Sequence, residues 1–108
     1  MPEVLEKFSD SGDSWIYMYS EKAGDNTILR LRRQVRVNLV DGRFLISEWY
    51  YHHTQADPVG FGIEDDKEVA DKRAYELLKD WAIKSCKGMG LTLEDRTEYA
   101  EQTANVPE

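Results

Sequence analysis

The clearest pattern of apolar and polar residues runs through residues 27–53, where apolar side chains alternate with polar ones on both sides of an Asp-Gly pair. Alternation with a period of two predicts β-strands, because successive side chains of a strand point to opposite faces. Asp41 and Gly42 are preferred in a two-residue hairpin turn, which needs positive φ at both positions. We therefore predict two long antiparallel strands, over about residues 27–40 and 43–53.

The position of this turn also sets the register of the hairpin, because Val40 then faces Arg43. The face predicted to cover the core holds the pairs Leu39–Phe44, Val37–Ile46, Val35–Glu48, Arg33–Tyr50 and Leu31–His52. The outward face holds the pairs Asn38–Leu45, Arg36–Ser47, Gln34–Trp49, Arg32–Tyr51 and Arg30–His53. A slip by one residue would exchange the faces and bury three arginines, so the register is strongly specified.

Two further elements are predicted before this hairpin. Residues 1–8 are compatible with one or two helical turns, in which Val4, Leu5 and Phe8 form a small apolar patch. After a polar segment that contains glycine, residues 15–20 combine aromatic and β-branched side chains, which favours a third strand.

The clearest helix of the chain follows the hairpin, from an N-cap at Asp65 or Asp66 to the region of Lys87 and Gly88. One stripe of this helix has small and apolar residues at three- and four-residue spacing: Ala70, Ala74, Leu77, Leu78, Trp81 and Ser85. The opposite side is charged, so we expect one face to pack on the sheet. The sheet residues expected beneath it are Val35, Val37, Leu39, Phe44 and Ile46.

The predicted fold class is α+β: a three-stranded antiparallel meander with one long helix packed across one face, plus a short N-terminal helix. Beyond Gly90 the sequence is compatible with a short strand over 91–93 or a short helix that begins at Thr92. We expect residues 1–92 to form a single domain, and residues 93–108 to form a short helix or a poorly ordered acidic tail.

Composition is that of an ordinary globular protein, because 108 residues with 41% hydrophobic content are enough for one small core. No run approaches the ~20 apolar residues of a membrane span, and the first residues do not have the features of a signal peptide. The lone cysteine, Cys86, has no partner for an internal disulfide, which fits a reducing compartment. We therefore expect a cytoplasmic protein without a membrane segment; no pattern indicates the oligomeric state.

Charge is distributed unevenly along the chain. The formal net charge is −7, yet residues 28–43 contain five arginines and one acid, so this segment carries +4 and the remainder −11. Nucleic-acid-binding domains are usually basic as a whole, because phosphate contacts and long-range attraction both need positive charge. The overall charge of this chain therefore disfavours nucleic acid as a partner.

The outward face of the hairpin is the candidate binding surface, with Arg30, Arg32, Arg36, Trp49 and Tyr51 as its residues. Arginine, tryptophan and tyrosine are enriched where binding energy concentrates in protein interfaces. They also suit contacts with phosphates and unpaired bases, and the remaining alternative is an ordinary solvated sheet face. We predict a small non-enzymatic protein that binds a protein partner, as accessory or inhibitory proteins do, with nucleic-acid binding as the alternative. Phosphate mimicry by the helix is disfavoured, because basic residues dilute its acidic charge.

Arg33 is an exception, because it falls on the face predicted to cover the core. Glu48 lies diagonally across the hairpin on the same face, so we expect the two to form a partly buried ion pair. A β-bulge near Arg32 or Arg33 would instead turn Arg33 outward.

The motifs that suggest catalysis or a cofactor are weak. His52 and His53 point to opposite faces of a strand and cannot easily bind one metal ion. Gly60 and Gly62 precede a helix, but acidic residues occupy the positions where a phosphate would bind. Cys86 lies near the helix end, where we expect a buried or spare cysteine rather than a nucleophile. We therefore predict no enzyme activity, no cofactor and no metal site.

A sheet followed by the segment "GFG" and a helix containing Ala70 and Ala74 is similar to the arrangement in double-stranded-RNA-binding domains and in the arm-binding domains of phage integrases. The resemblance covers residues 28–78. At the helix start, where the RNA-binding family has lysines for phosphate, this chain has "EDDKE". The resemblance therefore concerns the arrangement of elements and does not carry over the RNA-binding chemistry.

Overall fold

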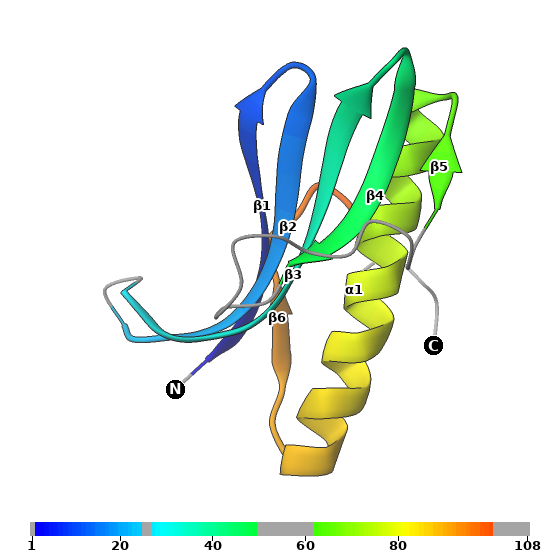
Figure 1. Cartoon of the computed structure of the whole chain (residues 1–108). Coiled ribbons are helices and arrows are strands. Elements are labelled where there is room, and N and C mark those ends of the chain that lie inside the picture. Colours follow the sequence, from blue (N-terminus) through cyan, green and yellow to red (C-terminus); the bar gives the residue numbers. More distant parts are fainter. Residues whose placement is uncertain (1, 25–26, 50–61, 101–108) are drawn as a thin grey trace.

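The computed structural model describes residues 2–24, 27–49 and 62–100, which form a six-stranded sheet covered on one face by a long helix (Figure 1). The elements are β1 (Glu3–Ser11), β2 (Ser14–Lys22), β3 (Ile28–Val40), β4 (Arg43–Trp49), β5 (Ile63–Glu64), α1 (Lys67–Met89) and β6 (Leu93–Asp95). The strand order is β5-β4-β3-β2-β1-β6, and only the β1–β6 pair is parallel among them. The α+β class is confirmed, but the predicted meander, now β2 to β4, is only the centre of a wider sheet.

The β3–β4 hairpin has the predicted register. Its pairs run from Gln34 with Trp49 to Val40 with Arg43. Asp41 and Gly42 have φ of 51° and 78°, so both turn residues adopt the positive φ that this turn requires. The pairs predicted beyond Trp49 lie outside the described residues.

The helical turn predicted for residues 1–8 is wrong, because this segment belongs to β1. Val4 and Leu5, adjacent and therefore on opposite faces of the strand, are both fully buried. A strand covered on both faces does not show simple alternation, and the remaining apolar spacing resembles a helical stripe. β1 instead forms a hairpin with β2, with a bulge at Asp10 just before the turn.

Helix α1 begins and ends with local signals. The Asp66 carboxylate accepts hydrogen bonds from the backbone N–H groups of Glu68 (2.8 Å) and Val69 (3.1 Å), which confirms one of the two predicted N-caps. Gly90, with φ of 69°, terminates the helix in the left-handed conformation.

The core lies between α1 and the sheet face beneath it. The buried helix residues are Ala70, Asp71, Ala74, Tyr75, Leu78, Ala82 and Cys86, with Leu77 and Trp81 partly buried beside them. They pack on β2, β3 and β4, including the predicted Val35, Val37 and Ile46, and partly buried Phe44. Leu39 is 39% exposed, so its predicted place in the core is wrong. The helix contact is centred on Tyr75 and Ala82, to one side of the predicted stripe.

Beyond Gly90 the structure has a strand, β6 at Leu93–Asp95, which begins two residues later than the predicted 91–93, and the alternative helix from Thr92 is wrong. β6 pairs in parallel with residues 3–5 of β1, and the Arg96 N–H extends this pairing by donating to the Leu5 carbonyl at 2.9 Å. In the part of the chain that the structure describes, no helix combines the length and apolar character that crossing a membrane requires.

The packing predicts the effect of truncating one core side chain. Leu78 is 1% exposed, so Leu78→Ala should lower the free energy of unfolding by about 3 kcal/mol, because it removes buried apolar surface and leaves a cavity. Val69, on the same helix, is 49% exposed, and Val69→Ala should change stability by less than about 0.5 kcal/mol. Urea unfolding of both variants tests this, and equal losses would contradict the described packing.

Candidate functional site

The predicted outward face loses most of its arginines to a β-bulge in β3. Tyr19 of β2 opposes Arg33 and Ser20 opposes Leu31, which leaves Arg32 as the extra residue. Side-chain alternation resumes with the opposite phase beyond a bulge, so Arg30 pairs with Glu21 on the helix side of the sheet. The outward orientation predicted for Arg30 and Arg32 is therefore wrong.

The other members of the predicted surface have separate outcomes. Arg36 pairs with Ile16 and Ser47 and keeps its outward position, where it is half-buried. Trp49 pairs with Gln34 in the predicted register, and Tyr51 lies outside the described residues. A binding role for these residues stays a prediction.

The arginines on the helix side pair with acids from other strands. Arg32 Nε lies 3.0 Å from Glu3 Oε1, and the Arg32 guanidinium also lies 3.9 Å from Glu21. Glu3 is fully buried and accepts a hydrogen bond from the Tyr19 hydroxyl at 2.7 Å. The cluster of basic residues in an acidic chain thus neutralises carboxylates that the fold brings beneath the helix.

Arg33 and Glu48 form the predicted ion pair, and the bulge does not turn Arg33 outward. Their side chains are 25% and 10% exposed, so the pair is partly buried. The Arg33 guanidinium carbon also lies 4.9 Å from the centre of the Trp81 ring, a cation–π distance. This pair therefore connects β3 and β4 to the second half of α1.

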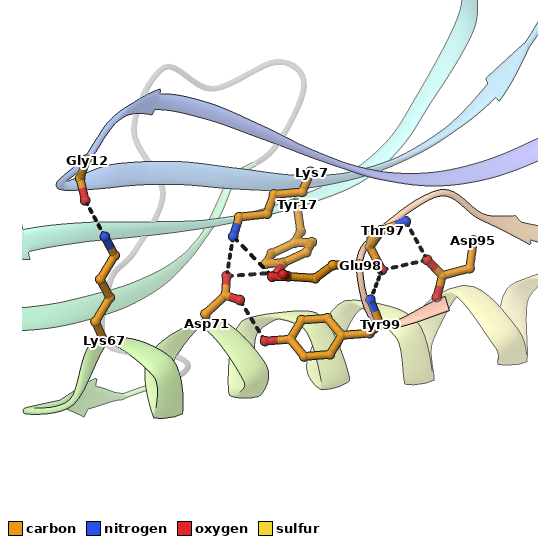
Figure 2. Close-up of polar contacts among 9 residues, drawn as sticks. All are labelled: Lys7, Gly12, Tyr17, Lys67, Asp71, Asp95, Thr97, Glu98 and Tyr99. Atoms are coloured by element: carbon orange, nitrogen blue, oxygen red, sulfur yellow. Dashed lines mark hydrogen bonds and ion pairs between the residues drawn. The ribbon is translucent and has the colours of Figure 1, made fainter. Parts of the chain in front are cut away.

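Asp71 is the centre of a second polar cluster, which lies on the same face of the sheet but against the first half of α1 (Figure 2). Its carboxylate accepts hydrogen bonds from the hydroxyls of Tyr17 (2.8 Å) and Tyr99 (2.7 Å). The Lys7 ammonium lies 3.1 Å from the same carboxylate and 3.7 Å from Glu98. Asp71 thus joins α1 to β1, to β2 and to the turn that follows β6.

These contacts keep the tyrosines protonated. Burial, and then the hydrogen bond to Asp71, raises the pKa of Tyr17 far above its usual value, and the same causes raise the pKa of Tyr99. Burial, followed by hydrogen bonds with Cys86 and Glu3, also raises the pKa of Tyr19. At neutral pH these hydroxyls are therefore donors and cannot act as general bases.

The turn that carries Tyr99 is positioned by Asp95. Its carboxylate accepts hydrogen bonds from Tyr75 and Lys79, both at 2.6 Å, and from the backbone and hydroxyl of Thr97. Burial by itself would raise the pKa of Asp95, but these donors outweigh it and lower the pKa. The turn is therefore held against α1, and the ring of Tyr99 lies 4.4 Å from that of Tyr75.

Between β1 and the first half of α1 the surface has a hollow with a volume of about 800 Å³. Its lining residues are Lys7, Ser9, Gly12, Trp15, Lys67, Glu68, Asp71, Lys72, Glu98 and Tyr99. Two ammonium groups lie over the indole of Trp15, at 5.4 Å for Lys7 and 5.5 Å for Lys67. Figure 2 shows that Lys67 reaches from the helix to the carbonyl of Gly12, whereas Lys7 reaches from β1 to the helix. We call this hollow the Trp15 pocket.

The strand beside the Trp15 pocket has an unpaired edge. The Leu5 carbonyl points away from β2, toward β6, and backbone groups two residues apart point in the same direction. The N–H and C=O groups of Lys7 and Ser9 therefore face away from β2, beyond the end of β6, and no described residue pairs with them. We call these four backbone groups the open edge of β1.

The polar side chains of this region already have partners within the fold. The Asp71 carboxylate accepts hydrogen bonds from two hydroxyls and lies within ion-pair distance of an ammonium group. Within the described ranges no three His, Cys, Asp or Glu side chains are grouped to hold a metal ion. His52 and His53 lie outside those ranges, and Cys86 is buried with its sulfur 3.2 Å from the Tyr19 hydroxyl.

Sequence reasoning missed Lys7, Trp15, Asp71 and Tyr99, because they come from separate elements and share no motif. One signal was present, namely that Asp71 borders the apolar stripe of the helix, three residues before Ala74 and seven before Leu78. A charged residue at such a position indicates a buried partner. Comparison of the chain with protein-family models, with curated proteins and with solved structures finds no match.

The Arg33–Glu48 pair predicts a double-mutant result. Arg33→Met or Glu48→Gln alone should cost about 2 to 4 kcal/mol, because each leaves a partly buried charge without its partner. The double variant should lose less than the sum of the two single losses. Urea unfolding of the four proteins measures the coupling, and strictly additive losses would show that the ion pair does not contribute.

The tyrosine pKa values predict a loss of stability in alkali. A raised pKa means that the folded protein holds the phenolic proton more tightly than the unfolded chain does. Stability is therefore complete below about pH 10, the unfolded value, and falls as the pH rises further. Tyr17→Phe should be less stable than the parent at pH 8 but should lose less stability between pH 9 and pH 11. Parallel slopes of unfolding free energy against pH would contradict the burial of this hydroxyl.

Proposed function

We propose that this protein is a non-enzymatic binding protein that accepts an extended segment of a protein partner on the open edge of β1. The observation that carries this proposal is the position of four backbone groups, at Lys7 and Ser9, that pair with no described residue and lie directly beside the Trp15 pocket. Strand addition uses such an arrangement: backbone hydrogen bonds provide affinity, and a pocket for alternate side chains provides specificity.

The short length of the open edge fits selective binding. A long, flat, apolar edge would lead to aggregation, whereas here Lys7 points inward and a bulge at Asp10 interrupts the strand. Phe8, which lies between the two edge residues and faces away from the helix, is 41% exposed and offers apolar contact on the other face. A docked strand would therefore contact the pocket with one set of side chains and Phe8 with the other.

A protein partner is favoured over a nucleic acid because two of the arginines already form ion pairs within the fold. Arg32 and Arg33 form ion pairs with Glu3 and Glu48, so their charges are already compensated. The net charge of −7 opposes the approach of a polyanion. An accessory or inhibitory protein of the cytoplasm is the class that we infer, because a single buried thiol, Cys86, needs no oxidising compartment.

The open edge predicts a selective effect of proline. The Ser9 N–H points away from β2, so Ser9→Pro should leave the β1–β2 pairing intact while removing an edge donor and obstructing strand addition. Ser9→Ala is the matched control, because it retains the N–H. In pull-downs from source cells, partner binding should be at least tenfold weaker for Ser9→Pro than for Ser9→Ala, with equal melting temperatures.

An Arg36→Ala variant and a nuclease treatment test which surface binds the partner and whether the partner is a protein. Arg36→Ala should bind like the parent, since Arg36 lies on the outward face and not at the open edge. Nuclease treatment should not release the partner. A partner retained by Ser9→Pro, lost by Arg36→Ala or released by nuclease would contradict the proposal.

A further inference from the structure

We propose that the segment docked on the open edge of β1 presents an acidic side chain, whose carboxylate lies in the Trp15 pocket between Lys7 and Lys67. This inference rests on the proposed function and adds the chemistry of the recognised residue. Two features support it: the strand register, which would direct one side chain of the partner into the Trp15 pocket, and the lysine ammonium groups in that pocket.

The register directs one residue of the partner into the pocket. The side chains of Lys7 and Ser9 both lie on the helix side of the sheet and line the pocket. Residues directly opposite each other on paired strands share a face, so the partner residue opposite Ser9 also points toward α1. Ser9 is small and exposed, which leaves space for that side chain between the strand and the helix.

The two ammonium groups make this space favourable for an anion. Lys7 and Lys67 lie within 5.4 Å and 5.5 Å of the same indole, so their positive charges converge on one ring. Lys7 is partly compensated by Asp71 and Glu98. Lys67 donates to the Gly12 carbonyl at 2.9 Å, and no described carboxylate lies within ion-pair distance of it. An ammonium group has three donors, so Lys67 retains capacity for a carboxylate.

Other side chains fit this space less well. Three lysines, Lys7, Lys67 and Lys72, line the pocket, so a basic residue would add a fourth positive charge beside them. An apolar residue would remove water from the Lys67 ammonium without replacing its hydrogen bonds. Three acids, Glu68, Asp71 and Glu98, also line the pocket. Asp71 is compensated by Lys7 and by two tyrosine hydroxyls. Glu68 and Glu98 are exposed, so water and salt screen their repulsion of a bound carboxylate.

Selection of peptides on the intact protein tests the inference. A display library of random nine-residue peptides, selected on the full chain with Ser9→Pro as counter-selection, should yield binders with Asp or Glu at one fixed position. Changing that residue to Asn or Gln in a synthetic peptide should weaken binding about tenfold, the effect of losing a charge-assisted hydrogen bond. On Lys67→Gln the acidic and amide peptides should bind equally, and Lys67→Arg should restore the preference.

Lys84→Gln is the matched control, because Lys84 lies on the same helix with a side chain 75% exposed and pairs only with Asp80 among the described residues. It should retain the tenfold preference. Edge-dependent peptides without a fixed acidic position, or an acid preference unchanged by Lys67→Gln, would overturn this inference and leave the proposed function standing.

A different result would overturn the proposed function itself. This would be the recovery of peptides that bind Ser9→Pro as well as the parent. Sedimentation of the free protein tests whether a second copy of the chain occupies the open edge of β1. A dimer that Ser9→Pro dissociates would show that a second copy pairs with β1, and would overturn both proposals. The expected result is a monomer.

Discussion

The carboxylate of Asp71 is the constraint on which the arrangement of the binding region depends. It sits on the buried face of α1, where an unpaired carboxylate would be costly, and it is compensated by donors from three other segments. The three donors are Tyr17 from β2, Lys7 from β1 and Tyr99 from the turn after β6. Because these groups must converge on one carboxylate, the helix, the edge strand and the C-terminal turn are held at fixed positions around the Trp15 pocket.

The arginine-rich strand compensates buried carboxylates in the same way beneath the second half of α1. Burying Glu3 and Glu48 beneath the helix requires positive charge nearby, and the bulge in β3 supplies it by directing Arg32 and Arg33 to one face. The two clusters together explain how a chain with net charge −7 keeps several carboxylates buried. The basic segment thus stabilises the fold, and we therefore assign the proposed partner binding to the strand edge.

The parts of the fold that could be predicted from sequence are those encoded locally. The turn at Asp41 and Gly42 and the N-cap at Asp66 depend on conformational preferences of neighbouring residues, and both are as expected. The strand β1 and the bulge at Arg32 depend on partners distant in sequence. A bulge near Arg32 or Arg33 was one alternative offered by the sequence, but its effect was not foreseen, because Arg32 turns toward Glu3, which belongs to a segment that resembled a helix. The candidate site was missed for the same reason, since its residues meet only after the sheet has formed.

Amide hydrogen exchange at β1 is the measurement that tests the central claim most directly. The N–H groups of Glu6 and Phe8 point to β2, whereas those of Lys7 and Ser9 point to the open edge. In the free protein the Lys7 and Ser9 amides should exchange rapidly, and a bound partner segment should slow both at least tenfold while Glu6 and Phe8 change little. Lys7 and Ser9 amides that are already protected in the free protein, or that stay unprotected in the complex, would contradict the account.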